Sequence, residues 1–272
     1  HEAVIAAASG HVCVHETGAI EASGHKCIAL SAAPGGKLTP AAVREAAAAH
    51  PDEHMVKPRL VYISNTTETG GVYSLEELEA LRAACDELGL LLYLDGARLS
   101  SALAAGGAAL ADLGRLCDAF YIGGTKNGAL FGEAVCILND ALKPDFRYIV
   151  KQRGGMLAKG WLLGVQFEEL FTGDLYAQLG AHANAMALRL RAGLAALGVP
   201  FAAPSDSNQQ FPILPNAVLD RLRPDFHWEQ QGTPDAGHTC IRLVTSWATR
   251  EEAVSAFLLA VERALGGCPA CL

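Results

Sequence analysis

Short apolar segments alternate with amphipathic helical patterns along the first half of the chain, and this alternation constrains the fold more than any other feature. Residues 27–30, 59–64 and 90–95 are apolar along most of their length, and a helical pattern separates each from the next. Strands without regular polar alternation occur in parallel sheets that helices cover on both faces. Residues 118–124 and 133–138 read as two further strands. We therefore expect an α/β fold whose mostly parallel sheet is sandwiched by helices.

Three sequence patterns predict where helices begin. Thr39 followed by Pro40 predicts a helix that begins at Pro40, because proline is favoured at the first helical position. The stretch "SLEE" from Ser74 is a capping box and predicts a helix that runs through Leu88. The stretch "TREE" from Thr249 predicts the start of the last helix in the same way.

The pattern changes after about residue 140. Long helical patterns are followed by three strand-like segments and a last helix, which is typical of a smaller α+β domain. The helical patterns cover residues 156–171 and 175–198, and the strand-like segments cover residues 209–214, 226–231 and 240–247. We expect a large domain over residues 1–150, a connecting helix over residues 151–175 and a small domain over residues 176–272.

Composition excludes several classes of protein. The net charge is −8 and no basic stripe is present, which argues against a nucleic-acid partner. No apolar run approaches the roughly 18 residues of a membrane span, and the first residues lack the basic start of a signal peptide. We expect a cytoplasmic enzyme. The opening stretch "HEAVIAA" begins where a strand or turn would already be under way, so we expect an N-terminal segment to be missing.

Most of the eight cysteines lie singly in apolar patterns, which predicts buried reduced thiols. These are Cys13, Cys27, Cys85, Cys117 and Cys136. The stretch "CPAC" near the end has no second cysteine pair at zinc spacing, so we expect no metal or redox role for it. His11 and His15 could share a metal ion, but no further ligands lie near them in the sequence, and we expect no metal site.

Charged residues follow two neighbouring strands where ligands bind in open α/β sheets. Asp95 ends one strand, Arg98 comes three residues later, and Lys126 follows the next strand within "GGTKNG". Taken singly, Asp95 could cap a helix and Lys126 could be a solvated loop residue. Taken together, they suggest a lysine whose pKa is lowered in a dry pocket, as a nucleophilic amine needs. An imine-forming lysine with an acid that pairs a pyridinium nitrogen is typical of pyridoxal phosphate chemistry.

The sequence resembles the low-specificity threonine aldolases, a group of β-eliminating lyases among the fold-type-I pyridoxal phosphate enzymes. The resemblance runs from residue 1 to about residue 265. The stretches that carry it are "GHVCVHETGA", "YISNTTETGGVYS", "LYLDGARLSSAL", "GGTKNGALFGEAV" and "IRLVTSW". "DGAR" alone is a weak signal, whereas "DGAR" followed at this distance by "TKNG", with the His–Glu segment upstream, is a strong one.

The resemblance implies a pyridoxal 5'-phosphate site and a role for each matching residue. Lys126 would bond covalently to the cofactor, Asp95 would pair with its ring nitrogen, and His11 would lie over its ring. Glu16 matches a family acid near the same site. Arg98, beside the cofactor, and Arg242, from the small domain, would hold the substrate carboxylate, because a guanidinium fork matches it.

The implied reaction is cleavage of the Cα–Cβ bond of a threonine-like β-hydroxy-α-amino acid to glycine and an aldehyde, in a homodimer or homotetramer. Some family members carry a histidine where this chain has Thr67 and Glu68, so the β-hydroxyl base is open. We expect His11, or a water molecule held by Glu16 or Glu68, to act as this base in place of the missing histidine. The family's phosphate-binding Gly/Thr turn would lie upstream of His1, so we expect no evident phosphate cradle and weak cofactor binding.

Three other functions remain open at this point. The first is another β-eliminating lyase on the same scaffold, which would release pyruvate and ammonia. The second is a truncated, non-catalytic protein that serves as a subunit. The third is nucleotide binding by "GGTKNG", although that stretch has neither Walker spacing nor a Gly-x-Gly-x-x-Gly turn.

Overall fold

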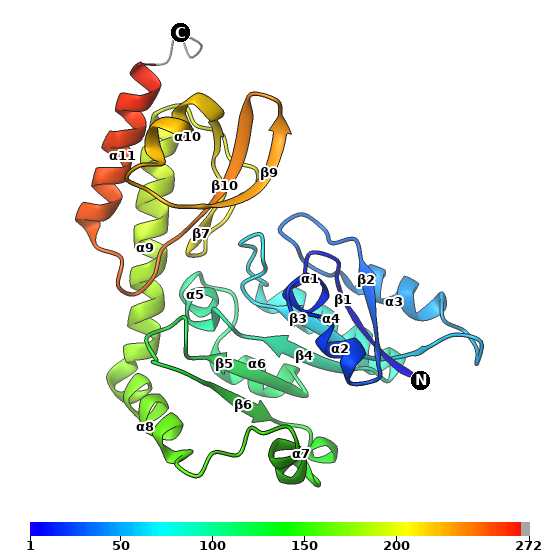
Figure 1. Ribbon diagram of the computed structural model, residues 1–272. Coiled ribbons are helices and arrows are strands. Elements are labelled where there is room, and N and C mark those ends of the chain that lie inside the picture. The colour runs from blue at the N-terminus through cyan, green and yellow to red at the C-terminus, as the bar shows by residue number, and fades with distance from the viewer. Residues whose placement is uncertain (268–272) are drawn as a thin grey trace.

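A computed structural model describes residues 1–267, and the stretch "CPAC" lies outside the described residues. The larger part holds a six-stranded sheet in the order β2-β1-β3-β4-β5-β6 (Figure 1). Every neighbouring pair is parallel except β5 and β6, which run antiparallel. The strands are β1 (Glu2–Ala7), β2 (Lys26–Leu30), β3 (Lys57–Ser64), β4 (Leu91–Asp95), β5 (Ala119–Gly123) and β6 (Glu133–Ile137). The expected mostly parallel α/β sheet is therefore confirmed.

Along the chain, helices lie between successive strands of this sheet, except between β5 and β6. They are α1 (His11–Val14), α2 (Ala19–Ala22), α3 (Pro40–Ala48), α4 (Leu75–Leu88), α5 (Leu99–Ala104) and α6 (Leu110–Leu116). The Thr39 side chain accepts a hydrogen bond from the Ala42 amide, and Ser74 and Glu77 close the expected capping box. Both helix starts predicted for this half are therefore confirmed.

A small antiparallel sheet lies beyond the long helix α9. Its strands are β7 (Gln209–Gln210), β8 (Ile213–Pro215), β9 (Glu229–Asp235) and β10 (His238–Val244), with β10 paired to the other three. The expected strand over residues 209–214 is thus two short strands, and the one over 226–231 begins later and extends further. The small sheet packs with α10 (Asn216–Leu222) and α11 (Glu251–Gly266).

The predicted capping box of the last helix is wrong. The helix α11 has Arg250 as its N-cap, and no side chain caps it. The Thr249 hydroxyl instead accepts a hydrogen bond from the Ser246 amide at 2.8 Å, because the chain turns there after β10. The Thr249 hydroxyl can serve either the turn or the helix cap, and the position of the chain at the end of β10 favours the turn.

Residues 151–175 do not form one connecting helix. They contain the end of α7 (Phe146–Gln152), then α8 (Trp161–Leu170) and a short 3-10 turn over Thr172–Asp174. The long connection is α9 (Leu175–Ala196), which in Figure 1 runs upright along the left side of the molecule, from the level of the large sheet to that of the small one. The division into two domains stays a prediction, with α9 rather than α8 as the link.

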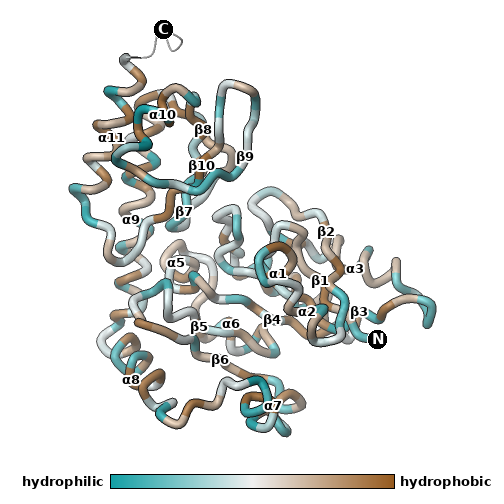
Figure 2. The backbone as a smooth tube through the Cα atoms, in the orientation of Figure 1, coloured by the Kyte–Doolittle hydropathy of each residue, from teal (hydrophilic) through white to brown (hydrophobic). Residues whose placement is uncertain are grey.

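Two hydrophobic cores share α9. Tyr176 near its start belongs to the core of the large sheet, which includes Leu92 and Leu94. Leu190 and Leu194 near its end belong to the core of the small sheet. Figure 2 shows the apolar strands at the centre of the large sheet. The helix therefore sets how the two parts lie relative to each other.

The contact of α9 with α5 is close enough to require glycine. A Cβ atom at Gly180 would lie 2.3 Å from the backbone oxygen of Ser100. Next to it, Asn184 accepts a hydrogen bond from the Ser101 hydroxyl at 2.6 Å and donates one to the Ser101 carbonyl oxygen at 2.9 Å. This tight polar contact fixes α9 against the helix that follows β4.

A charged cluster ties the amino end of β4 to its neighbours. The Asp118 carboxylate accepts hydrogen bonds from the Leu92 amide at 2.7 Å, Arg82 Nη1 at 2.8 Å and Asn139 Nδ2 at 2.7 Å. Burial raises the pKa of Asp118, but these hydrogen bonds outweigh burial and hold the pKa below its usual value. The ionised form of Asp118 therefore stabilises this end of the sheet.

The cysteines differ in burial. Cys85, Cys117 and Cys240 are buried, whereas Cys13, Cys27 and Cys136 are partly exposed, so the expectation of uniform burial is wrong. All six are free thiols. Within residues 1–267, no helix is long and apolar enough to cross a bilayer. Over the same residues, no group of three or more His, Cys, Asp or Glu side chains is placed to hold a metal ion.

Candidate active site

The three charged residues predicted at the strand ends lie at one edge of the large sheet. Asp95 is the last residue of β4 and is buried, Arg98 directly precedes α5, and Lys126 lies in the loop after β5. Parallel neighbours β4 and β5 deliver their carboxyl ends to the same place. Two glycines allow this close approach: a Cβ at Gly96 would lie 2.0 Å from the Tyr121 carbonyl oxygen, and one at Gly123 would lie 2.5 Å from the Gly96 carbonyl oxygen.

The loop that carries Lys126 is held by hydrogen bonds on both sides. Before it, the Gly124 amide donates to the Glu133 carboxylate at 2.6 Å. After it, the buried Asn127 donates to the Gly123 carbonyl oxygen at 2.7 Å and accepts a bond from Ser100. The amide of Asn127 donates to the Gly124 carbonyl oxygen. These internal bonds use the amides of Gly124 and Asn127, which argues against a phosphate cradle or nucleotide site in "GGTKNG".

The surroundings of Lys126 lower the pKa of its amine. The side chain reaches solvent, so the site is more open than the dry pocket that we expected. Partial desolvation by the surrounding protein nevertheless lowers the pKa of Lys126, and the neighbouring Arg98 lowers it further. Asp95 and Glu133 act in the opposite direction without restoring the ordinary pKa. A larger fraction of Lys126 is therefore an unprotonated amine than for a surface lysine.

The two predicted arginines come together from different parts of the chain. Burial lowers the pKa of Arg98, and the positive charge of the nearby Arg242 on β10 lowers it further. Arg242 Nη2 donates a hydrogen bond to the Glu229 carboxylate on β9. Arg242 Nε is buried and has no hydrogen-bond partner among the described residues. Two cations at one place, one with an unused donor, are suited to bind an anionic group.

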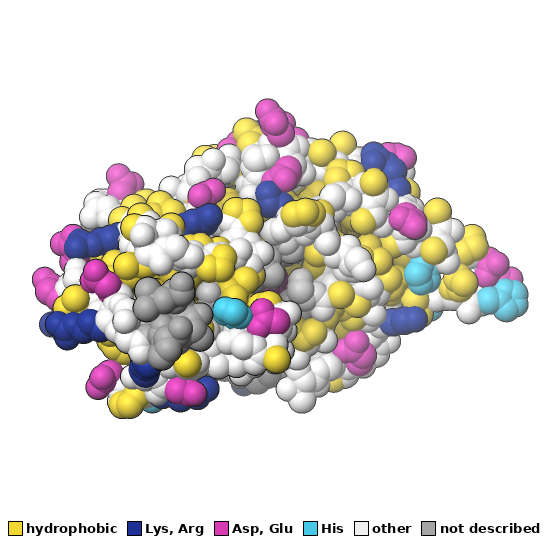
Figure 3. All heavy atoms as spheres, turned by 90° about the horizontal axis from the view of Figure 1, so that it is seen from above, with side chains coloured by type: hydrophobic (Ala, Val, Ile, Leu, Met, Phe, Trp, Pro, Cys, Tyr) yellow, Lys and Arg dark blue, Asp and Glu magenta, His cyan; other side chains and the backbone are white. Residues whose placement is uncertain are grey.

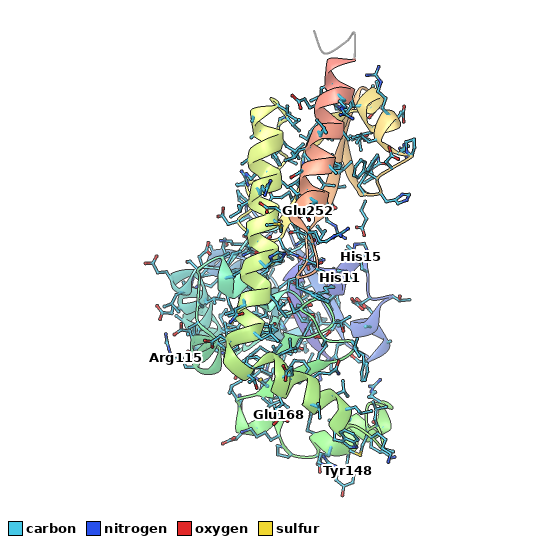
Figure 4. All side chains as sticks on the ribbon, turned by 90° about the vertical axis from the view of Figure 1, so that its left-hand side faces the viewer. His11, His15, Arg115, Tyr148, Glu168 and Glu252 are labelled. Atoms are coloured by element: carbon cyan, nitrogen blue, oxygen red, sulfur yellow. The ribbon has the colours of Figure 1, made fainter. Side chains whose placement is uncertain are left out.

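A hollow of about 540 Å³ lies between α1, the loop after β3 and the hairpin of β9 and β10. Its lining includes His11, His15, Glu68, Glu229 and Arg242. Figure 4 shows His11 and His15 next to each other, between the large sheet and the small domain, and their ring centres are 4.8 Å apart. The hollow therefore lies between residues of the larger part of the chain and Arg242 of the small sheet.

His11 and Glu16, which the resemblance places at one site, are paired. Glu16 Oε1 lies 2.6 Å from His11 Nδ1, which assigns the proton of the neutral ring to Nδ1 and leaves the lone pair on Nε2. The His11 amide donates to Glu68 Oε1 at 2.8 Å, and the Ser64 hydroxyl donates to the same oxygen. Thr67, by contrast, is buried, and its hydroxyl donates to the Gly35 carbonyl oxygen. Thr67 and Glu68 stand where some family members carry a histidine, and of the two it is Glu68 that faces the hollow.

Three residues near the site were not predicted. Tyr62 and Tyr121 donate hydrogen bonds to Asp95, and Glu229 pairs with Arg242. A signal could be read only for their neighbour Tyr93, because a period of two along a strand places it on the same face as Asp95. The strand register that brings Tyr62 and Tyr121 to the same carboxylate was not readable from the sequence.

The fold and these residues fit the class of the pyridoxal-phosphate-dependent lyases, because an amine and a buried carboxylate lie at one edge of the large sheet, near Arg98 and Arg242. The chain belongs to the beta-eliminating lyase family, whose model matches residues 1–216.

Threonine aldolases are among the similar proteins. The low specificity L-threonine aldolase of Pseudomonas sp. (strain NCIMB 10558) is 37% identical over 259 residues, which cover 93% of this chain and 74% of that protein. The corresponding protein of Pseudomonas aeruginosa is 38% identical over 229 residues, with 82% of this chain and 66% of that protein covered. A solved structure of Leishmania major threonine aldolase superposes with a TM-score of 0.94 at 52% identity, covering 96% of this chain and 77% of the other.

The described residues fit the cofactor of this family, pyridoxal 5'-phosphate. Lys126 offers an amine whose pKa is lowered, and Asp95 is a buried carboxylate at the neighbouring strand end. His11 lies beside the same edge, on the wall of the hollow. The described part of the chain therefore contains the side chains needed to bind the pyridine ring of the cofactor and to react with its aldehyde group.

Proposed function

We propose that this chain cleaves the Cα–Cβ bond of threonine-like β-hydroxy-α-amino acids to glycine and an aldehyde, with pyridoxal 5'-phosphate as cofactor. The observation that carries the proposal is the convergence of Lys126, Asp95, Arg98 and Arg242, which come from the ends of β4 and β5 in the large sheet and from β10 in the small one. The names of the similar proteins support the same activity.

Bound pyridoxal phosphate supplies an electron sink for the pair released when the Cα–Cβ bond breaks. Lys126 is the residue that would hold the cofactor covalently, because its lowered pKa makes the amine available. Asp95 would hold the ring nitrogen protonated from the end of β4. Both roles use groups that the sheet edge fixes in place.

Arg98 and Arg242 would bind and orient the substrate carboxylate. A carboxylate accepts two parallel hydrogen bonds from a guanidinium fork, and Arg242 Nε is an unused buried donor. Glu229, which now pairs with Arg242, would have to give way to the substrate. Holding the substrate at two points restricts its rotation, which can supply several kcal/mol of a reaction barrier.

His11 is our choice for the base that takes the β-hydroxyl proton. Its Nδ1 proton is engaged by Glu16, so Nε2 is the atom that can accept a proton. Glu16 would also stabilise the imidazolium that results, as a carboxylate paired to a histidine does. Glu68 holds the His11 backbone and faces the same hollow, which makes it the second candidate through a bound water.

Two further parts of the proposal concern location and assembly. The six described cysteines are free thiols, which supports a reducing compartment such as the cytoplasm. Apolar side chains that are exposed on α8 and before β6 support a homo-oligomer; they include Leu130, Trp161 and Val165. On the face shown in Figure 3, basic and acidic side chains are interspersed, which does not favour a nucleic-acid partner.

The test is a product assay of the purified chain with pyridoxal phosphate and L-threonine. We expect glycine and acetaldehyde in equal amounts, and loss of both in Lys126→Ala. Lys143→Ala is the matched control, because Lys143 is an exposed lysine of the same half that pairs with Asp140. Release of 2-oxobutanoate and ammonia would show an eliminating lyase instead, and a cofactor-loaded chain without either product pair would refute catalysis.

A further inference from the structure

Three tyrosines form a row across neighbouring strands beneath Asp95. Tyr62 on β3 is paired in register with Tyr93 on β4, and their ring centres are 5.1 Å apart. Tyr121 on β5 continues the row, 6.5 Å from Tyr93. Side chains two residues apart on a strand share a face, so Tyr93 and Asp95 project from the same side of the sheet. The row therefore leads to the carboxylate at the carboxyl end of β4.

The outer two tyrosines bind different oxygens of Asp95. The Tyr62 hydroxyl donates to Oδ2 at 2.7 Å, and the Tyr121 hydroxyl donates to Oδ1. Oδ1 also accepts the amide of Ala97 at 2.9 Å. The hydroxyl of the central Tyr93 makes no hydrogen bond to any described residue. The two outer tyrosines and one amide thus hold both ends of the carboxylate.

Both outer phenols remain protonated donors over the ordinary pH range. Burial raises the pKa of Tyr62, and the negative charge of Asp95 raises it further. The same two causes raise the pKa of Tyr121, with smaller contributions from Glu133 and Tyr93. An ionised carboxylate has only acceptors, so the direction of both hydrogen bonds is settled: each tyrosine donates and Asp95 accepts.

Counting acceptor positions shows what remains for a ligand. A carboxylate has about four lone-pair positions, two on each oxygen. Tyr121 and Ala97 use both positions on Oδ1, and Tyr62 uses one on Oδ2. One position on Oδ2 is left, which matches the single N–H of a protonated pyridine ring.

We propose that Tyr62 and Tyr121 are positioning residues that fix Asp95 with one oxygen position open for the cofactor's ring nitrogen. The proposal rests on the proposed pyridoxal phosphate function. It adds that the acid–ring contact is built by two phenols, and that the number of donors on Asp95 sets how strongly it holds the ring proton. Removal of one phenol frees a second acceptor position and one direction of rotation.

The test compares three Tyr→Phe variants, because phenylalanine keeps the ring and removes only the hydroxyl. Tyr93→Phe is the matched control, since it lies in the same row and its hydroxyl binds no carboxylate. In holoenzyme with L-threonine, we expect kcat to fall about tenfold in Tyr62→Phe and in Tyr121→Phe, because Asp95 is then free to rotate and holds the ring less well aligned. The fall is the equivalent of one hydrogen bond to a charged group. KM should stay within about twofold in all three, because no tyrosine of the row lines the substrate hollow.

A second readout does not depend on turnover. Nuclear magnetic resonance of an isotope-labelled ring nitrogen in bound pyridoxal phosphate reports its protonation directly. With fewer donors on Asp95, the remaining charge holds the ring proton more strongly, so the nitrogen should lose its proton at higher pH in Tyr62→Phe and Tyr121→Phe. If both variants match Tyr93→Phe in this titration and in kcat, the proposal is wrong.

A third readout uses the cofactor-free chain and protects the test against a variant that does not fold. Ultraviolet absorbance counts ionised tyrosines as pH rises. Burial keeps both phenol pKa values raised in Asp95→Asn, but the added effect of the Asp95 charge is gone, so the last of the six tyrosines to ionise should do so at lower pH than in the wild-type chain. An alkaline titration curve identical to that of the wild-type chain would overturn the hydrogen-bonded arrangement. Failure of the proposed function would show differently, as wild-type chain without glycine production but with this tyrosine titration intact.

Discussion

Replacement of Gly180 with alanine tests how closely α9 must approach α5. The added methyl group would lie 2.3 Å from the Ser100 carbonyl oxygen and 2.4 Å from the carbonyl carbon. Both distances are far inside van der Waals contact, and the obstacle is backbone, which cannot rotate away. Overpacking costs up to about 3 kcal/mol, whereas alanine in place of helical glycine contributes about 1 kcal/mol. We expect a net loss of about 2 kcal/mol in the free energy of unfolding.

The matched control is Gly114→Ala in α6, where a Cβ would meet nothing within 4 Å. This variant should gain about 0.5–1 kcal/mol, because only the helix preference changes. Urea unfolding followed by circular dichroism measures both. In Gly180→Ala the displaced α9 should also move Arg242 away from Arg98 and raise KM for threonine. Equal stability of the two variants would refute the close-contact reasoning.

Three further predictions concern single charged groups. Because the folded chain lowers the pKa of Lys126, protonation costs more in the folded than in the unfolded state. Lys126→Met should therefore raise the urea midpoint of the cofactor-free chain at neutral pH, and this gain should fade above about pH 10.4, where lysine is neutral in both states. Glu229→Gln removes the internal competitor for Arg242, so KM for threonine should fall about two- to fivefold, as steady-state kinetics would show. The pKa of Asp118 is lowered in the fold, so its stabilisation is present above the unfolded value near pH 3.9 and is lost as pH falls through the folded value. Asp118→Asn should lower the free energy of unfolding at neutral pH and make it depend less on pH in the acid range, as urea unfolding at several pH values would show. An unchanged dependence on pH would contradict this.

Local patterns predicted the elements and the three charged groups at the sheet edge. Asp95, Arg98 and Lys126 were found because each lies at or within three residues of the end of an apolar run, and parallel strands deliver their ends together. The capping box at Ser74 formed because its helix begins where the sequence pattern begins. The similar pattern at Thr249 failed because a turn after β10 takes its hydroxyl.

The contacts that the sequence did not reveal depend on register. Tyr62 and Tyr121 are separated by 59 positions in the chain, and only the alignment of β3, β4 and β5 brings both to one carboxylate. Glu229 reaches Arg242 because β9 and β10 pair with local irregularities, which a sequence pattern does not place. Pairing across strands is a property of the assembled sheet, and no single segment carries it.

The helix shared by the two cores determines what an unfolding experiment would see. The three tryptophans, Trp161, Trp228 and Trp247, all lie outside the large sheet, whereas the row of tyrosines lies on it. Trp161 lies on α8 beside the core of the large sheet, so the fluorescence of Trp228 and Trp247 is measured in a Trp161→Phe variant. That fluorescence reports on the small sheet and its surroundings, and tyrosine absorbance reports on the large sheet. Because α9 contributes Tyr176 to one core and Leu190 to the other, neither core can melt without removing part of the other's packing. The two chromophores should consequently register one cooperative transition from opposite ends of the molecule.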